Sequence, residues 1–80
     1  MGVALMSWDR PFAQPVPLPG GKPARTLRDA GDFVRTLSIL EQDAPEWRHA
    51  VQMLTDAAED RGAIFLAKIG MDRALNRKIN

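Results

Sequence analysis

The sequence predicts a small α+β domain in which a two-stranded antiparallel hairpin packs on three helices, in the order ββααα. Prolines at alternate positions near the N-terminus are typical of an edge strand, and a Gly-Gly pair after them indicates a turn. Three segments with apolar residues at helical spacing complete the chain. We expect one domain over residues 1–80, with a loose N-terminus over residues 1–7.

The hairpin is predicted over residues 11–26. Its first strand carries prolines that all stand at odd-numbered positions: Pro11, Pro15, Pro17 and Pro19. Successive N–H groups of a strand point to opposite edges, so these prolines remove donors from one edge and leave the other edge free to pair. Phe12, Val16 and Leu18 then share the face that points to the helices. Gly20-Gly21 forms the turn, and residues 22–26 return.

The first helix is predicted over residues 27–38. Thr26 and Asp29 have the spacing of a capping box, in which each side chain accepts a hydrogen bond from the backbone of the other. The apolar stripe of this helix consists of Leu27, Ala30, Phe33, Val34 and Leu37. Gly31 weakens the helix and therefore indicates the close approach of another element. The connection that follows leaves Ile39 and Leu40 half-buried.

The second helix, predicted over residues 44–61, is the centre of the expected fold. We expect a capping box between Asp43 and Glu46, with Pro45 in the first turn, where a missing N–H costs nothing. Gly62 is expected to end the helix in the left-handed conformation.

The apolar stripe of this central helix recurs at steps of three and four residues: Trp47, Ala50, Val51, Leu54, Ala57 and Ala58. Trp47 is its largest member and should contribute most to the core. We expect Trp47, Val51 and Leu54 to form the seam on which the hairpin and the other helices close.

The third helix is predicted over residues 63–77. Its expected apolar positions are Phe65, Leu66, Ile69, Ala74 and Leu75. Gly70 indicates close packing against a neighbouring element. Basic residues lie towards its C-terminal end, where positive charge suits the helix dipole: Lys68, Arg73, Arg77 and Lys78.

Four stretches of these helices resemble a group of short, uncharacterised alphaproteobacterial proteins that share a domain of unknown function. They are TLRDA (26–30), DAPEW (43–47), AKIG (67–70) and RALNR (73–77). The resemblance implies a ββααα arrangement. It implies no activity and no functional residues, because none is attached to the family.

Composition excludes several classes of protein. The chain has no cysteine, which excludes disulfides and thiolate metal sites and fits the reducing cytoplasm. A net charge of +1 gives no general attraction to nucleic acid or to anionic lipid. The opening MGVALM is too short and lacks the basic start of a signal peptide, and no apolar run is long enough to span a bilayer. We therefore expect a cytoplasmic protein without membrane contact.

Motifs for catalysis, metal binding or cofactor binding are absent from the sequence. His49 is the single histidine and has Met53 at the next helical turn, so we expect a solvated surface histidine. No serine lies in a GxSxG motif, and Lys22 after Gly20-Gly21 lacks the spacing of a phosphate-binding loop. We therefore expect no enzyme activity and no cofactor.

Acidic residues crowd the C-terminal turn of the central helix, where negative charge opposes the helix dipole: Asp56, Glu59 and Asp60. We expect pairing with Arg61, Lys68 or Arg73. A basic patch on a partner or a hard cation would be an alternative, although the sequence lacks a calcium-binding loop.

The function that the sequence favours is binding to another protein or to a second copy of the chain. An 80-residue chain buries only about 60% of its unfolded surface, so a partner would add needed stability. The expected contact residues lie on the hairpin and the third helix: Trp8, Phe12, Met71 and Leu75.

The alternative function is a nucleic-acid-binding regulator. Residues 54–77 would form a helix-turn-helix-like segment with Gly62 in the turn. Its phosphate contacts would come from Lys68, Arg73, Arg77 and Lys78. The apolar pattern fits this segment poorly, and Asp72 lies among the expected contacts.

Overall fold

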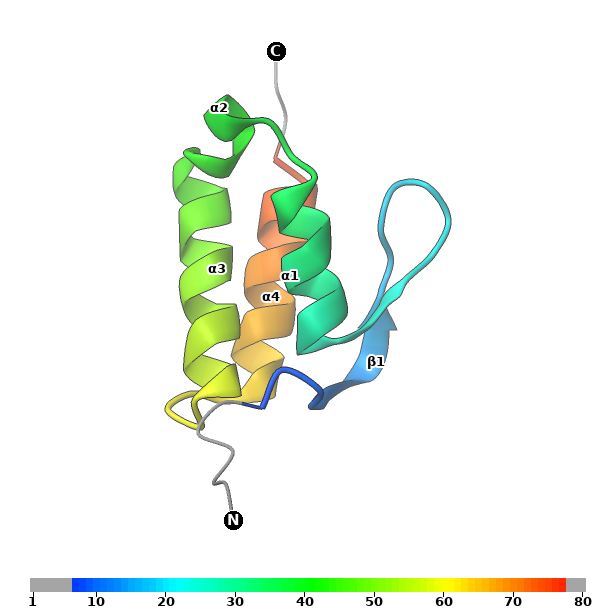
Figure 1. Cartoon of the computed structure of the whole chain (residues 1–80), viewed down its shortest axis with the longest axis vertical. Helices are drawn as coiled ribbons and strands as arrows, with labels where there is room; N and C mark the ends of the chain where they lie inside the picture. The colour runs from blue at the N-terminus through cyan, green and yellow to red at the C-terminus, as the bar shows by residue number, and fades with distance from the viewer. Residues whose placement is uncertain (1–6, 78–80) are drawn as a thin grey trace.

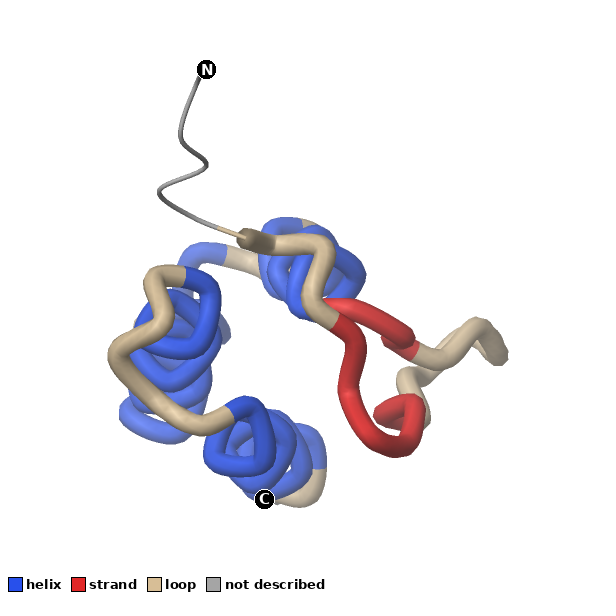
Figure 2. The backbone as a smooth tube through the Cα atoms, turned by 90° about the horizontal axis from the view of Figure 1, so that it is seen from below, coloured by secondary structure: helices blue, strands red, loops and turns tan. Residues whose placement is uncertain are grey.

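The predicted order of elements is confirmed by the computed structural model, which describes residues 7–77 of the chain. Strands β1 (Pro11–Val16) and β2 (Ala24–Thr26) form an antiparallel sheet, and the helices α1 (Leu27–Arg35), α2 (Ile39–Gln42), α3 (Pro45–Ala58) and α4 (Ile64–Leu75) follow. Figure 1 shows α1, α3 and α4 side by side, with α2 as a short turn at one end. The strands lie along one side of the helix group (Figure 2). No helix in the described part of the chain is long and apolar enough to cross a membrane.

The hairpin has the proline arrangement that the sequence predicts. The Leu27 amide donates to the Arg10 carbonyl at 3.1 Å, so the backbone of Arg10 faces β2. Adjacent residues of a strand face opposite edges, so the backbone of Pro11 faces the outer edge of β1. Phe12 and Val16 are buried on the inner face, whereas Pro11 is exposed. The residues paired across the sheet are Pro11 with Thr26 and Val16 with Ala24, with an irregularity between them.

Helix α1 begins as predicted and ends earlier. The Thr26 hydroxyl accepts from the Asp29 amide at 3.2 Å, and the Asp29 carboxylate accepts from the Thr26 amide at 3.3 Å, which confirms the capping box. The helix ends at Arg35 because Ser38 starts the separate helix α2, its hydroxyl accepting from the Glu41 amide at 3.1 Å.

Two predictions about the residues before α3 are wrong. Ile39 and Leu40 are 83% and 87% exposed rather than half-buried, because α2 turns them away from the helix group. The N-cap of α3 is Ala44, without a side-chain hydrogen bond, so the Asp43–Glu46 capping box does not form. Asp43 instead ends α2, and its amide donates to the Ile39 carbonyl at 3.0 Å.

The left-handed residue that ends α3 is Asp60, with φ of 62°, and not the predicted Gly62. The Asp60 amide donates to the Ala57 carbonyl at 3.1 Å, and the Arg61 amide donates to the Asp56 carbonyl at 2.7 Å. This pair of hydrogen bonds is the Schellman arrangement, which satisfies the last carbonyls of a helix. It closes two residues before Gly62 and so shortens α3 relative to the predicted 44–61.

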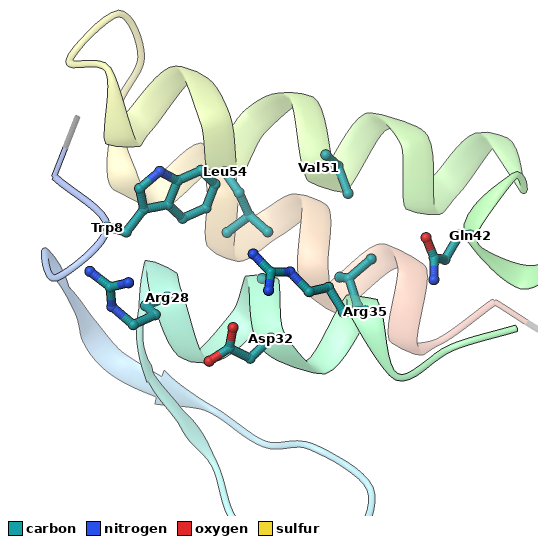
Figure 3. Close-up of a pocket in the computed structure, with 9 residues that line it drawn as sticks. Trp8, Arg28, Asp32, Arg35, Gln42, Val51 and Leu54 are labelled. Atoms are coloured by element: carbon teal, nitrogen blue, oxygen red, sulfur yellow. The ribbon is translucent and has the colours of Figure 1, made fainter. Parts of the chain in front are cut away.

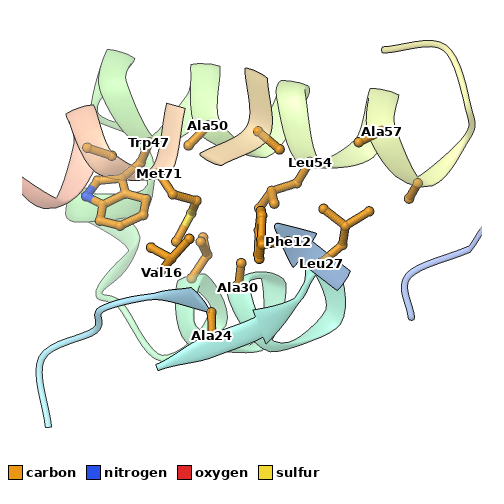
Figure 4. Close-up of a cluster of buried hydrophobic side chains, with 14 of the residues drawn as sticks. Phe12, Val16, Ala24, Leu27, Ala30, Trp47, Ala50, Leu54, Ala57 and Met71 are labelled. Atoms are coloured by element: carbon orange, nitrogen blue, oxygen red, sulfur yellow. The ribbon is translucent and has the colours of Figure 1, made fainter. Parts of the chain in front are cut away.

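Side chains of the inner strand face and of α1, α3 and α4 meet in one core (Figure 4). Trp47 and Leu54 are 2% and 1% exposed, as predicted. The Phe33 ring packs on Trp47, with the ring centroids 5.9 Å apart. Val51 is 39% exposed, so its prediction as part of the central seam is wrong.

Helix α4 packs on α3 through small side chains. A Cβ atom on Gly70 would stand 3.2 Å from the Cα atom of Ala50, which confirms the close packing expected at Gly70. The buried residues of α4 are Ala67, Gly70, Met71 and Ala74. This contact rotates α4 away from the predicted orientation, because it turns Phe65, Leu66 and Ile69 outward. Those three residues were expected in the core.

Candidate functional site

The candidate site is the outward side of α4, which we call the α4 apolar face and define as Phe65, Leu66 and Ile69. These side chains are 64%, 41% and 44% exposed. Helix α4 is therefore apolar on two opposite sides, of which α3 covers one. A helix that is apolar all round is normally covered all round, because apolar area in contact with water is unfavourable. The α4 apolar face is consequently a surface that lacks cover within the described chain.

A pit lies beside Phe65, between α4 and β1. Its volume is about 300 Å³, and its lining residues are Pro11, Phe12, Ala13, Ile64, Phe65 and Lys68. The Lys68 ammonium donates to the Asp72 carboxylate at 2.9 Å, so this charge is already paired. The pit therefore presents mainly apolar groups, which suit an aliphatic or aromatic side chain from outside.

The residues that the sequence predicts as a contact surface do not come together as one. Phe12 and Met71 are 5% and 0% exposed, so their prediction as contact residues is wrong. Both side chains point into the core, since the inner face of β1 and the small-residue side of α4 meet there (Figure 4). Leu75 is half-buried against the core.

Trp8, predicted as a contact residue, folds back on the domain and is partly buried against the core. A Cβ atom on Gly31 would meet the Trp8 ring at 3.4 Å, so Gly31 admits the indole against α1. The neighbouring Ser7 amide donates to the Ala58 carbonyl at 2.7 Å. Ser7 is therefore held by α3, contrary to the prediction of a loose segment there; the rest of the predicted loose N-terminus, 1–6, lies outside the described residues.

A groove of about 310 Å³ separates α1 from α3, with Trp8 at one end and Gln42 at the other (Figure 3). Val51 lines this groove, which leaves its side chain exposed. The Arg28 guanidinium donates to the Asp9 carboxylate at 2.9 Å, and this hydrogen bond raises the pKa of Arg28 above its ordinary value. The Gln42 amide donates to the Leu37 carbonyl at 2.8 Å. Arg28 and Gln42, which line the groove, are thus already hydrogen-bonded within the chain. The α4 apolar face is therefore the stronger candidate for a binding surface.

The acidic cluster at the end of α3 is paired within the chain, as predicted. Arg61 forms ion pairs with Asp56, at 3.4 Å, and with Glu59. Asp60 pairs with Arg10 at 3.4 Å, and the Arg10 guanidinium also donates to the Ala57 carbonyl at 2.8 Å. Arg10 therefore places a cation at the helix C-terminus, a role that its sequence position did not indicate.

Side chains that could hold a metal ion do not converge in the described part of the chain. No three histidine, cysteine or carboxylate side chains in residues 7–77 are placed to hold a metal ion. His49 is exposed, as predicted, and lines a shallow cavity with Pro45, Glu46 and Arg73.

The basic residues of the nucleic-acid alternative are largely engaged elsewhere. Lys68 pairs with Asp72, and Arg77 donates to Glu41 at 2.9 Å and to Glu46 at 3.1 Å. Arg73 is exposed, and Lys78 lies outside the described residues. Helices α3 and α4 run in opposite directions side by side (Figure 1), whereas the helices of a helix-turn-helix cross at a steep angle.

Comparisons with protein-family models, with curated proteins and with solved structures find no match. The resemblance to short alphaproteobacterial proteins therefore stays a prediction. The function is therefore argued from the exposure and the apolar character of the α4 apolar face.

Proposed function

We propose that this chain is a small cytoplasmic protein-interaction module that acts by binding rather than by catalysis, with the α4 apolar face as its contact surface. The observation that supports this proposal is the exposure of Phe65, Leu66 and Ile69 on one side of α4. Complete burial of an exposed side chain of this kind contributes about 1.5–3 kcal/mol, and each of these side chains still has about half of that to gain, because they are 41–64% exposed. The absence of cysteine supports a reducing compartment.

The strand edges offer less to a partner than the helix does. Pro11 has no N–H and faces the outer edge of β1, and Pro15 and Pro17 follow at the same parity in the sequence. A partner strand would need those donors to extend the sheet. Recognition through side chains on α4 is therefore favoured over backbone pairing with β1.

The test is affinity purification of the tagged protein from the source cell, comparing two matched double variants. Phe65→Ser with Ile69→Ser removes the α4 apolar face, while Ile39→Ser with Leu40→Ser removes equally apolar side chains at the exposed α2. We expect bound proteins to be lost from the first variant and retained by the second. Both should keep the wild-type circular dichroism spectrum, because all four side chains are substantially exposed. Equal recovery of partners by the two variants would remove the proposal.

The nucleic-acid alternative has less support, because Lys68 and Arg77 are held in ion pairs. It predicts duplex binding that weakens steeply with salt, with a shallower salt dependence after Arg73→Ala and Arg77→Ala. We expect no binding at low salt in a fluorescence-anisotropy titration. Salt-dependent binding with that response to the two substitutions would favour the alternative.

A further inference from the structure

We infer that residues 7–9, which we call the N-terminal strap, open and close one end of the groove between α1 and α3 while the helices stay folded. In this structure the N-terminal strap is closed and places Trp8 at that end of the groove (Figure 3). When it opens, the place of the indole becomes a site for a small planar aromatic molecule. The inference is independent of the proposed function, because neither the strap nor the groove contains a residue of the α4 apolar face.

The N-terminal strap is bound to both helices that border the groove. On the α3 side, the Ser7 amide donates to the Ala58 carbonyl at 2.7 Å. On the α1 side, the Arg28 amide donates to the Trp8 carbonyl, also at 2.7 Å. The strap therefore bridges the end of α3 and the start of α1, and its release frees one end of the groove.

Arg10 is the fixed end of the strap. Its guanidinium donates to the Ala57 carbonyl at 2.8 Å in a part-buried hydrogen bond, and its own carbonyl accepts from the Leu27 amide at 3.1 Å. Phe12, two residues further along the chain, is buried in the core. A chain that is held at Arg10 and at Phe12 moves only in the residues before them, which places the hinge between Asp9 and Arg10.

The contacts of the strap itself lie close to the surface. Ser7 and Asp9 are exposed, and Trp8 is only partly buried, whereas Trp47 in the core is 2% exposed. The side chains of the ion pair between Asp9 and Arg28 are 79% and 56% exposed, so this pair contributes little and is screened by salt. Segments with few buried apolar contacts open at a lower free energy than the whole domain. The N-terminal strap should therefore open before the core does.

Trp8 indicates which group this end of the groove accepts. A Cβ atom on Gly31 would stand 3.4 Å from the indole, so the glycine lets a flat ring lie against α1. Val51 and Leu54 line the groove from α3. A slot between two helices with an apolar lining suits a planar apolar ring. A small aromatic molecule of the size of indole would bind the open form and compete with Trp8 for the same place.

Hydrogen exchange at two neighbouring amides, measured by NMR on the full chain, is the first test. Leu27 and Arg28 stand in the first turn of α1, where amides have no partner within the helix, so their protection comes from the carbonyls of Arg10 and Trp8. We expect the Arg28 amide to be about 10- to 1000-fold less protected than the Leu27 amide, because only the first depends on the strap. Equal protection of the two amides would overturn the inference.

The second test weakens the closed strap. Asp9→Asn removes the ion pair with Arg28 and should speed exchange of the Arg28 amide by about 1.5- to fivefold, the range for an exposed pair, without changing Leu27. About 0.5 M salt should have the same effect on the wild type and none on Asp9→Asn. Asp43→Asn, at an exposed aspartate outside the strap, is the control and should change neither amide. An Arg28 amide that responds neither to Asp9→Asn nor to salt would contradict the closed strap.

Indole is the probe for the vacated end of the groove. A ligand of this size is expected to bind the open form with a Kd of about 1 mM. Indole at about 5 mM should then raise the open population, and with it the exchange rate of the Arg28 amide, about sixfold. The Leu27 amide should not change. An unchanged Arg28 amide, or an equal rise at both amides, would overturn the aromatic site.

Discussion

Gly70 of α4 lies so close to α3 that a Cβ atom at this position would stand 3.2 Å from the Cα atom of Ala50. A larger side chain must push the two helices apart, because the nearest atom belongs to the backbone and cannot rotate away. We expect Gly70→Val to destabilise the protein by about 1–3 kcal/mol, measured by urea denaturation.

Gly31→Ala is the matched control for Gly70. The added methyl group would meet the Trp8 ring at 3.4 Å, which is an ordinary contact with a side chain that can adjust. We expect stability to be unchanged or raised by up to about 1 kcal/mol through helix propensity. A Gly70→Val protein as stable as the wild type would contradict the packing of α3 on α4.

Leu54 and Val51 should respond differently to truncation, although both belong to the predicted apolar stripe of α3. Leu54 is 1% exposed, so Leu54→Ala should cost about 2–5 kcal/mol. Val51 is 39% exposed at the groove, so Val51→Ala should change stability by no more than about 0.5 kcal/mol. Thermal denaturation followed by circular dichroism compares them, and equal losses would show that the groove is closed in solution.

Asp60→Gly should stabilise the protein by about 0.5–1 kcal/mol, because Asp60 adopts a φ of 62° that glycine reaches without steric cost. The ion pair with Arg10 subtracts little, since the Asp60 side chain is 91% exposed. Asp60→Ala is the control and should lower stability, because alanine neither reaches this φ as glycine does nor forms the ion pair with Arg10. Chemical denaturation of the three proteins gives the order, and a less stable glycine variant would refute this account of the end of α3.

Glu41 of α2 connects this helix to α3 and to the segment that follows α4, and it should be sensitive to truncation. Its carboxylate accepts from the Trp47 indole at 3.2 Å and from the Arg77 guanidinium at 2.9 Å, and both Glu41 and Arg77 side chains are 25% exposed. We expect Glu41→Ala to cost about 1–3 kcal/mol, because it leaves two partly buried donors without an acceptor. Glu41→Gln retains an acceptor and should cost less.

A double-mutant cycle separates these contributions. Glu41→Ala and Arg77→Ala together should destabilise the protein by less than the sum of the single effects, because the two residues share one contact. Exactly additive losses in urea denaturation would show that the ion pair contributes nothing in solution.

Local sequence signals determined several elements of this fold. The Thr26–Asp29 capping box, the Gly-Gly turn and the place of Pro45 in the first turn of α3 depend on residues within a few positions of each other. The alternating prolines and the Trp47–Leu54 spacing are likewise periodic features of one segment. Such features are readable from sequence because the interactions that they specify are short-range.

Only the tertiary structure decided which side of α4 is buried. By sequence, Phe65, Leu66 and Ile69 are better core residues than Ala67, Gly70 and Ala74, since they are larger and more apolar. The smaller residues are buried instead, because they let α4 approach the backbone of α3. The tertiary structure also decided the role of Arg10, whose guanidinium donates to the Ala57 carbonyl 47 positions away in the sequence.

The sequence by itself determined the class of fold, the order of the elements and most of the core of α3. The tertiary structure alone decided the rotation of α4 and, through it, the location of the candidate surface. The physical reason is that periodicity identifies the sides of a helix that are apolar, while the closest approach of two backbones selects which of those sides is covered.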